Sequence, residues 1–167
     1  MCNTAGLSGN RSRGSLDPPA LLALSTNTPF AIYPCSIQYT VVPGVSSEEQ
    51  LHPHQSERFE ILFGEVEFKL AGEIVLARAG DVVMVEKGTP HQFRNIGEED
   101  VRFRTEVRPA LSFETFLETM FGFASDGKTN EKGMPNPFHL AVIMDEHFDL
   151  VRLPFPSAWM QRIGLAL

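Results

Sequence analysis

The feature that most limits the possible folds is a series of short stretches in which apolar and polar residues alternate, between residues 36 and 108. The clearest stretch is 101–108, where the residues of one parity are Val101, Phe103, Thr105 and Val107. A period of two is typical of a strand with one buried face. About seven or eight such strands, separated by turns, predict a mainly β protein built as a sandwich or barrel.

The other predicted strands are bounded by glycine-containing turns. Alternation predicts strands at 36–42 and 58–63, and in the second of these Glu57, Phe59, Ile61 and Phe63 are expected on one face. Residues 65–70 and 74–77 predict a hairpin, and 82–85 predicts a buried strand. His91, Phe93 and Asn95 share one face of the next strand.

After Pro109 the apolar spacing changes from two to the period of a helix. Residues at positions 113, 116, 117, 120 and 121 predict a helix from near Ser112 to residues 122–127. A second helix is expected at 138–151 and a short third one at 158–167, capped by Ser157. We therefore expect a flexible arm at 1–30, in which 20–24 forms at most one helical turn, a barrel at 31–110 and packed helices at 111–167.

Charge and hydropathy limit the partners. The 167 residues carry 14 basic and 21 acidic side chains, a formal net charge of −7, which argues against nucleic acid or anionic lipid as the main partner. No apolar run approaches the roughly 20 residues needed to span a bilayer. The negative net charge favours an uncharged or cationic small-molecule ligand. No secretory leader is visible, so a cytoplasmic location is expected.

Two histidines and one glutamate are the candidates for a divalent metal site. His52 precedes a predicted strand, Glu57 lies at its start and His91 lies on another strand, so a closed sheet brings them together. Two imidazoles with a carboxylate suit iron, manganese, nickel, copper or zinc and leave positions open for ligands. The same three residues are the candidate catalytic groups, as metal ligands or in proton transfer.

The spacing of these residues resembles the two motifs of the cupins. In the second motif, Gly80 and Gly88 precede His91 and Asn95 at the spacing typical of the family, and Glu86 stands where proline is usual. In the first, the seven-residue step from Glu57 to Gly64 sets the register. The resemblance, strongest to a single-domain monocupin or conserved-barrel subgroup, covers residues 36–161 and implies a jelly-roll barrel with two or three C-terminal helices.

That register implies a departure in the metal site. Three histidines and a glutamate commonly hold the metal in cupins, and here Gln50 occupies the position of the first histidine. An amide oxygen is a weaker donor than imidazole for a transition metal. Gln50 is therefore expected to complete the shell weakly, to act through water or to hydrogen-bond in the pocket.

Residues of the interior parity are the candidates for a substrate pocket. They either line an apolar pocket above the metal or fill an ordinary core, and they are Tyr39, Phe59, Ile61, Phe93, Phe103 and Thr105.

Three functions fit these observations. The first is a metal-dependent enzyme acting on a small apolar or aromatic molecule, most plausibly an oxygenase-type oxidoreductase. The second is a metal-optional isomerase, cyclase or lyase that uses glutamate and histidine for proton transfer. The third is a barrel that binds a small ligand without catalysis. Cupins commonly pair through their sheets, so a homodimer is expected.

Overall fold

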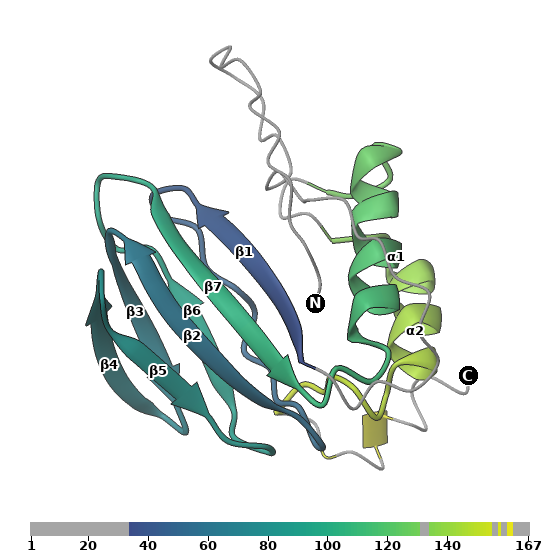
Figure 1. Cartoon of the computed structure of the whole chain (residues 1–167). Coiled ribbons are helices and arrows are strands. Elements are labelled where there is room, and N and C mark those ends of the chain that lie inside the picture. Colours follow the sequence, from purple (N-terminus) through teal and green to yellow (C-terminus); the bar gives the residue numbers. More distant parts are fainter. Residues whose placement is uncertain (1–33, 131–133, 155–156, 158–159, 162–167) are drawn as a thin grey trace.

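The computed structural model describes residues 34–130, 134–154, 157 and 160–161. Seven strands precede two helices in the described chain (Figure 1). The strands are β1 (Cys35–Val41), β2 (Ser56–Phe63), β3 (Glu65–Leu70), β4 (Glu73–Arg78), β5 (Val82–Val85), β6 (His91–Arg94) and β7 (Val101–Arg108). The helices are α1 (Phe113–Ser125) and α2 (Pro137–Glu146).

The strands form two antiparallel sheets with the orders β1-β7-β2-β5 and β4-β3-β6. β7 lies between β1 and β2, so segments far apart in sequence are neighbours, as Figure 1 shows. In the β2–β7 pair, Glu57 lies opposite Val107, Phe59 opposite Thr105 and Ile61 opposite Phe103. The prediction of a mainly β, jelly-roll-like fold with helices near its C-terminal part is confirmed.

The inner faces of the two sheets share one apolar core. Phe59 and Ile61 of β2, Phe68 of β3 and Phe103 of β7 are each at most 2% exposed. Phe59 contacts the rings of Phe68 and Phe103 with centroids 5.0 and 5.7 Å apart. Burying aromatic rings against one another supplies a large share of the stability of such a small barrel.

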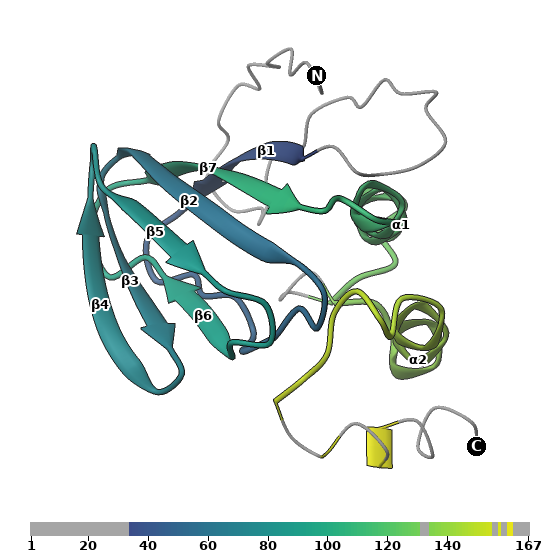
Figure 2. The same cartoon turned by 60° about the horizontal axis from the view of Figure 1, so that its bottom comes forward.

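The two helices lie side by side at one side of the barrel (Figures 1 and 2). Phe113 and Leu117 of α1 pack with Val107 of β7, Ile37 of β1 and Leu150 in a second apolar cluster. The predicted stripe of α1 therefore does bury its apolar face. It covers Cys35 and Ile37 of β1 and Val107 of β7.

Two expected strand faces differ from the structure. Phe63 is 40% exposed instead of sharing the inward face of Glu57, because a bulge after Ile61 sets two residues of β2 against one of β7. Phe63 then lies on the outer side, where the Arg102 guanidinium is 5.1 Å from its ring centroid. β5 is only half buried, since it is an edge strand whose Val82 and Met84 face outward.

The second helix is shorter than predicted. α2 ends at Glu146 because the backbone N–H groups of Leu150 and Val151 both bond to the His147 carbonyl, which turns the chain back towards the barrel. The predicted arm at 1–30, with its helical turn at 20–24, and most of the predicted helix at 158–167 lie outside the described residues. Within the described part of the chain, no helix has the length and hydropathy to cross a membrane.

Candidate metal centre

Backbone pairing brings the two candidate histidines to one end of the barrel. Gln50 and His91 form a bridge through two hydrogen bonds of 2.9 and 2.8 Å. Leu51 and Arg152 form a second bridge, and the His52 carbonyl accepts a 2.7 Å bond from the N–H of Gly88. The segment before β2 is thus held on both sides, and His52 projects towards β6 and β2.

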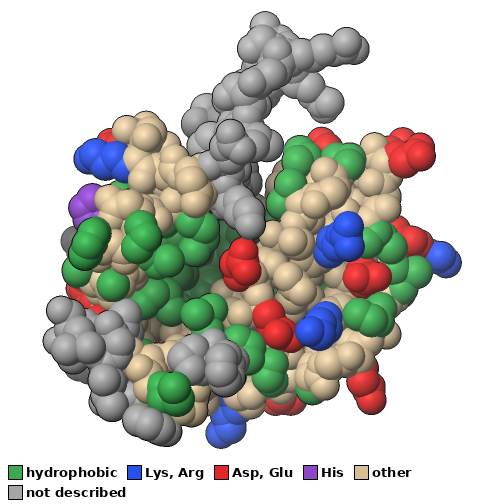
Figure 3. All heavy atoms as spheres, turned by 180° about the vertical axis from the view of Figure 1, so that it is seen from behind, with side chains coloured by type: hydrophobic (Ala, Val, Ile, Leu, Met, Phe, Trp, Pro, Cys, Tyr) green, Lys and Arg blue, Asp and Glu red, His purple; other side chains and the backbone are tan. Residues whose placement is uncertain are grey.

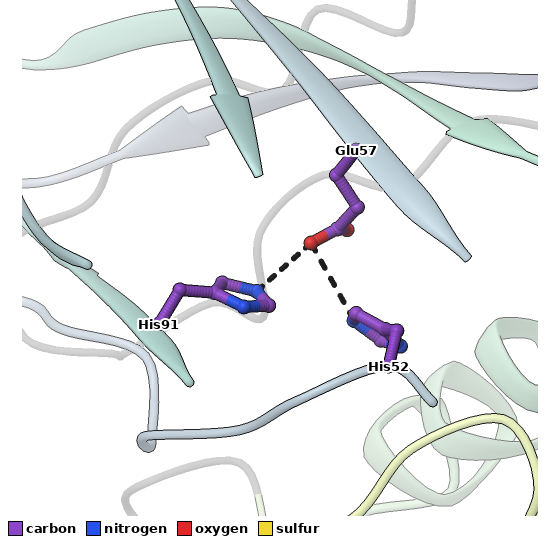
Figure 4. A group of neighbouring side chains, drawn as sticks. All are labelled: His52, Glu57 and His91. Atoms are coloured by element: carbon purple, nitrogen blue, oxygen red, sulfur yellow. Dashed lines mark ion pairs between the residues drawn. The ribbon is translucent and has the colours of Figure 1, made fainter. Parts of the chain in front are cut away.

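The side chains of His52, Glu57 and His91 converge from a loop, from β2 and from β6 (Figure 4). Glu57 Oε2 lies 2.8 Å from His91 Nε2 and 3.5 Å from His52 Nε2. One donor atom from each residue lies within 4.8 Å of the others. The structure therefore brings together three of the four residues predicted as metal ligands.

Outward hydrogen bonds fix both rings. His52 Nδ1 donates to the Leu150 carbonyl at 2.7 Å, and His91 Nδ1 donates to the Thr89 carbonyl at 3.1 Å. Because carbonyls only accept, a neutral ring must keep its proton on Nδ1 and direct the lone pair of Nε2 inward. Metal-binding histidines are oriented in this way in proteins.

The inward atoms fit a bound cation. His52, Glu57 and His91 are 3%, 3% and 1% exposed. Their inward atoms, Nε2, Oε2 and Nε2, have no hydrogen-bond partner of good geometry among the described residues. With neutral rings, three buried acceptors face one another, which is unfavourable unless a metal ion or a proton lies between them. The donor set fits a divalent transition metal.

The ionisation of the two histidines differs. Burial lowers the pKa of His52, and the nearby Glu57 charge only partly offsets this effect. Burial also acts on His91, but its contact with Glu57 outweighs desolvation and raises the pKa of His91 above its ordinary value. Of the two rings, His91 is therefore the one that takes up a proton more readily.

A cavity of about 170 Å³ adjoins this group. Four of the residues predicted to line a pocket do so, namely Tyr39, Phe59, Phe93 and Thr105, and the Gln50 side chain is also at its wall. Ile61 and Phe103 belong to the core instead. They form the next pair along β2 and β7, one step further from Glu57 than Phe59 and Thr105.

Part of the wall comes from a helix that the sequence had not connected to the site. Phe113, Phe116 and Leu117 of α1 line the cavity, and the Phe113 ring packs edge-on against His52 with centroids 5.8 Å apart. Helical periodicity predicted their burial but could not indicate against which surface. Figure 3 shows hydrophobic side chains gathered around a hollow between the helical part and the strands.

The described fold agrees with comparison to known proteins. Residues 37–107 match the family described as "Cupin domain". A solved structure of an uncharacterised conserved protein with a double-stranded β-helix domain, from Klebsiella pneumoniae, superposes with a TM-score of 0.50 at 23% identity. That match covers 59% of this chain and 84% of the other. Residues 37–107 thus match the cupin domain that the motifs had indicated.

Other similarities extend over part of the chain. A Streptomyces cyaneus protein named "Polyketide synthase CurC" is 33% identical over 67 residues, which are 40% of this chain and 44% of that protein. A predicted oxalate decarboxylase from Thermotoga maritima is 30% identical with a TM-score of 0.43, over 44% of this chain and 64% of the other. The chain therefore spans less than two thirds of either protein.

Proposed function

We propose that this cupin is a metal-dependent enzyme acting on a small, largely apolar or aromatic molecule, most plausibly as an oxygenase-type oxidoreductase. The observation that carries the proposal is the set of three buried acceptor atoms, Oε2 of Glu57 and Nε2 of His52 and His91, directed at one point. Two imidazoles and a carboxylate are the set used by non-haem iron oxygenases.

In this proposal each group has a defined role. His52, Glu57 and His91 hold the metal, and the Leu150 and Thr89 carbonyls orient the two rings. Gln50 completes the shell or hydrogen-bonds in the pocket. The metal supplies Lewis acidity and open positions for ligands. The aromatic walls of the cavity bind an apolar substrate and exclude water from its reacting end.

Metal analysis tests the proposal first. The protein is purified without added metal and its content measured by elemental analysis, then stripped and titrated with Fe²⁺, Mn²⁺, Ni²⁺, Cu²⁺ and Zn²⁺. We expect the native protein to bind one ion per chain and the His91→Ala variant to lose this binding. The His139→Ala variant is the control and should retain it, because the side chain of His139 is exposed on α2. Oxygen uptake with phenolic and enolic substrates tests the reaction. Turnover that persists in the stripped protein contradicts the proposal.

A second function is favoured by the contact between Glu57 and His91. A carboxylate 2.8 Å from an imidazole of raised pKa is a proton-transfer pair, which suits a metal-optional isomerase, cyclase or lyase. The similarity to a protein named polyketide synthase supports a substrate with enolisable carbonyl groups. Activity that withstands chelators, with exchange of substrate C–H for deuterium, favours this function over the first.

We also propose that the protein is a cytoplasmic homodimer. β4 and β5 are edge strands, and Ile74, Leu76, Val82 and Met84 on them are 60%, 45%, 46% and 51% exposed. Exposed apolar edges favour pairing with a second copy. Sedimentation is expected to give a dimer that Leu76→Lys dissociates, whereas a monomeric native protein contradicts the proposal. Fractionation of cells tests the location.

A further inference from the structure

Thr105 has a buried hydroxyl that the fold does not use. The residue is 1% exposed, and its Oγ1 has no hydrogen-bond partner in the described part of the chain. It lies on the inner face of β7, opposite Phe59 of β2 and Ile37 of β1, and lines the cavity. An unpartnered buried hydroxyl costs stability, and valine of the same shape would avoid that cost.

The remaining walls define what the cavity accepts. Its rings, Phe59, Phe93, Phe113 and Phe116, come from both sheets and from α1. No lysine or arginine is among the described residues of the lining, so the walls away from the His52–Glu57–His91 group offer no counter-charge to a carboxylate or phosphate. A dry apolar cavity of about 150 Å³ is large enough for benzene, and this one measures about 170 Å³.

The register places Thr105 one step from the metal candidates. Glu57 pairs with Val107, and Phe59 with Thr105, so the hydroxyl lies two residues along the strand from the Glu57 row. The backbone step between the two rows is about 6.6 Å, and both side chains border the same cavity, whose volume accepts one aromatic ring. Tyr39 borders the same space.

We propose that the ligand is an uncharged single-ring phenol or its enol equivalent with two oxygens, one held at the His52–Glu57–His91 group and the second hydrogen-bonded to Thr105. The inference rests on the proposed function, because the metal holds the first oxygen. Thr105 then acts as a specificity residue: it selects for the second oxygen and has no part in binding the metal.

Binding of matched probes tests this assignment. The native protein and three variants are titrated calorimetrically with phenol, resorcinol and hydroquinone, both metal-free and loaded with Co²⁺. Thr105→Val removes the hydroxyl, and Thr105→Ser keeps it. Thr40→Val makes the same change on the exposed side of β1 and serves as the control. Unfolding midpoints and Co²⁺ affinity are measured for all four proteins.

We expect one of the two-oxygen probes to bind about three- to tenfold more tightly than phenol. Thr105→Val should abolish that preference, leave phenol and Co²⁺ binding unchanged and keep or raise the unfolding midpoint. Thr105→Ser should retain the preference, and Thr40→Val should behave as the native protein. If the Thr105 hydroxyl had a purely structural role, the Thr105→Val variant would instead have a lower unfolding midpoint than the native protein.

The remaining outcomes separate the two proposals. If neither Co²⁺ nor any of the ions titrated above binds, the metal-dependent function fails. A preference for a two-oxygen probe in the metal-free protein that Thr105→Val abolishes then still supports the contact with Thr105, and the absence of such a preference overturns it. If Co²⁺ binds, three results overturn the Thr105 assignment alone. The three probes bind with equal affinity, the preference for a two-oxygen probe survives Thr105→Val, or no probe binds at millimolar concentration.

Discussion

The two halves of the β2–β7 pair serve opposite ends of the barrel. Around Ile61 and Phe103 the buried side chains are apolar and pack against one another. Glu57 and Thr105 lie beside the apolar Val107 and Phe59, but each has an inward oxygen with no hydrogen-bond partner of good geometry among the described residues. The core half stabilises the fold, and the site half carries polar groups that the proposed metal and ligand would satisfy. Four predictions test this division.

The largest effect is expected in the core half. Phe103 is fully buried and its ring lies 5.1 to 5.7 Å from those of Phe93, Tyr39 and Phe59. Phe103→Ala should lower the free energy of unfolding by about 3–5 kcal/mol, measured with urea. Phe63→Ala is the control, since that ring is 40% exposed, and should cost about 1 kcal/mol or less. Similar losses in the two variants would show that the barrel interior is not the stabilising half.

Changing the carboxylate in the site half should affect binding rather than folding. Glu57→Gln keeps the side-chain volume but removes the charge, so metal affinity should fall by about 100-fold or more, measured by calorimetry. The metal-free variant should change in unfolding free energy by only about 1 kcal/mol, because the new amide can donate to Nε2 of a neutral His91 in place of the lost ion pair. Glu60→Gln, on the outer face of β2, should leave both quantities unchanged. Strong destabilisation by Glu57→Gln would contradict the division.

The segment after α2 should matter for the site more than for the barrel. Truncation after Glu146 removes the Leu150 carbonyl that orients His52, so metal affinity should fall about 10- to 100-fold. The proton of His52 should then no longer be confined to Nδ1, which nitrogen NMR of the ring detects. Truncation after Leu153 retains Leu150 and Arg152 and is the matched control. Equal affinity in both shortened chains would exclude this orienting role.

The smallest effect is a pH dependence of metal binding. The pKa of His91 is raised, so its ring stays protonated at pH values above the ordinary 6.5 and must lose that proton to bind metal. Metal affinity should therefore fall about tenfold per pH unit below that raised pKa. His52, whose pKa is lowered, should add a second proton only at more acid pH. Calorimetric titrations in buffers of different ionisation enthalpy count the protons released on metal binding. If no proton is released near neutral pH, the pKa of His91 is not raised and this prediction is wrong.

How far the sequence predicted the molecule depended on the range of the interactions involved. The strands follow from local alternation and α1 from the helical spacing of its apolar residues, so Val101 to Arg108 and the helix from Phe113 were predicted almost to the residue. The bulge after Ile61 and the end of α2 at Glu146 depend on partners far along the chain, and both were missed.

The same limit applies to the site. Spacing within the two motifs was enough to single out His52, Glu57 and His91, since each motif is local. The contributions of Leu150 and of α1 come from tertiary packing, and periodicity alone cannot show which surface a helix meets. Thr105 was predicted by parity to face inward, but only the structure shows that its hydroxyl lacks a partner.

The partner that orients His52 lies 98 residues later in the chain. During synthesis at about 5–20 residues per second, β1 to β7 are made about 2–8 s before Leu150. Because this partner is made so late, the His52 ring takes its final orientation only after the segment that follows α2 has been made and has packed. The order of synthesis therefore places the fixing of the first candidate ligand after the strands that surround it.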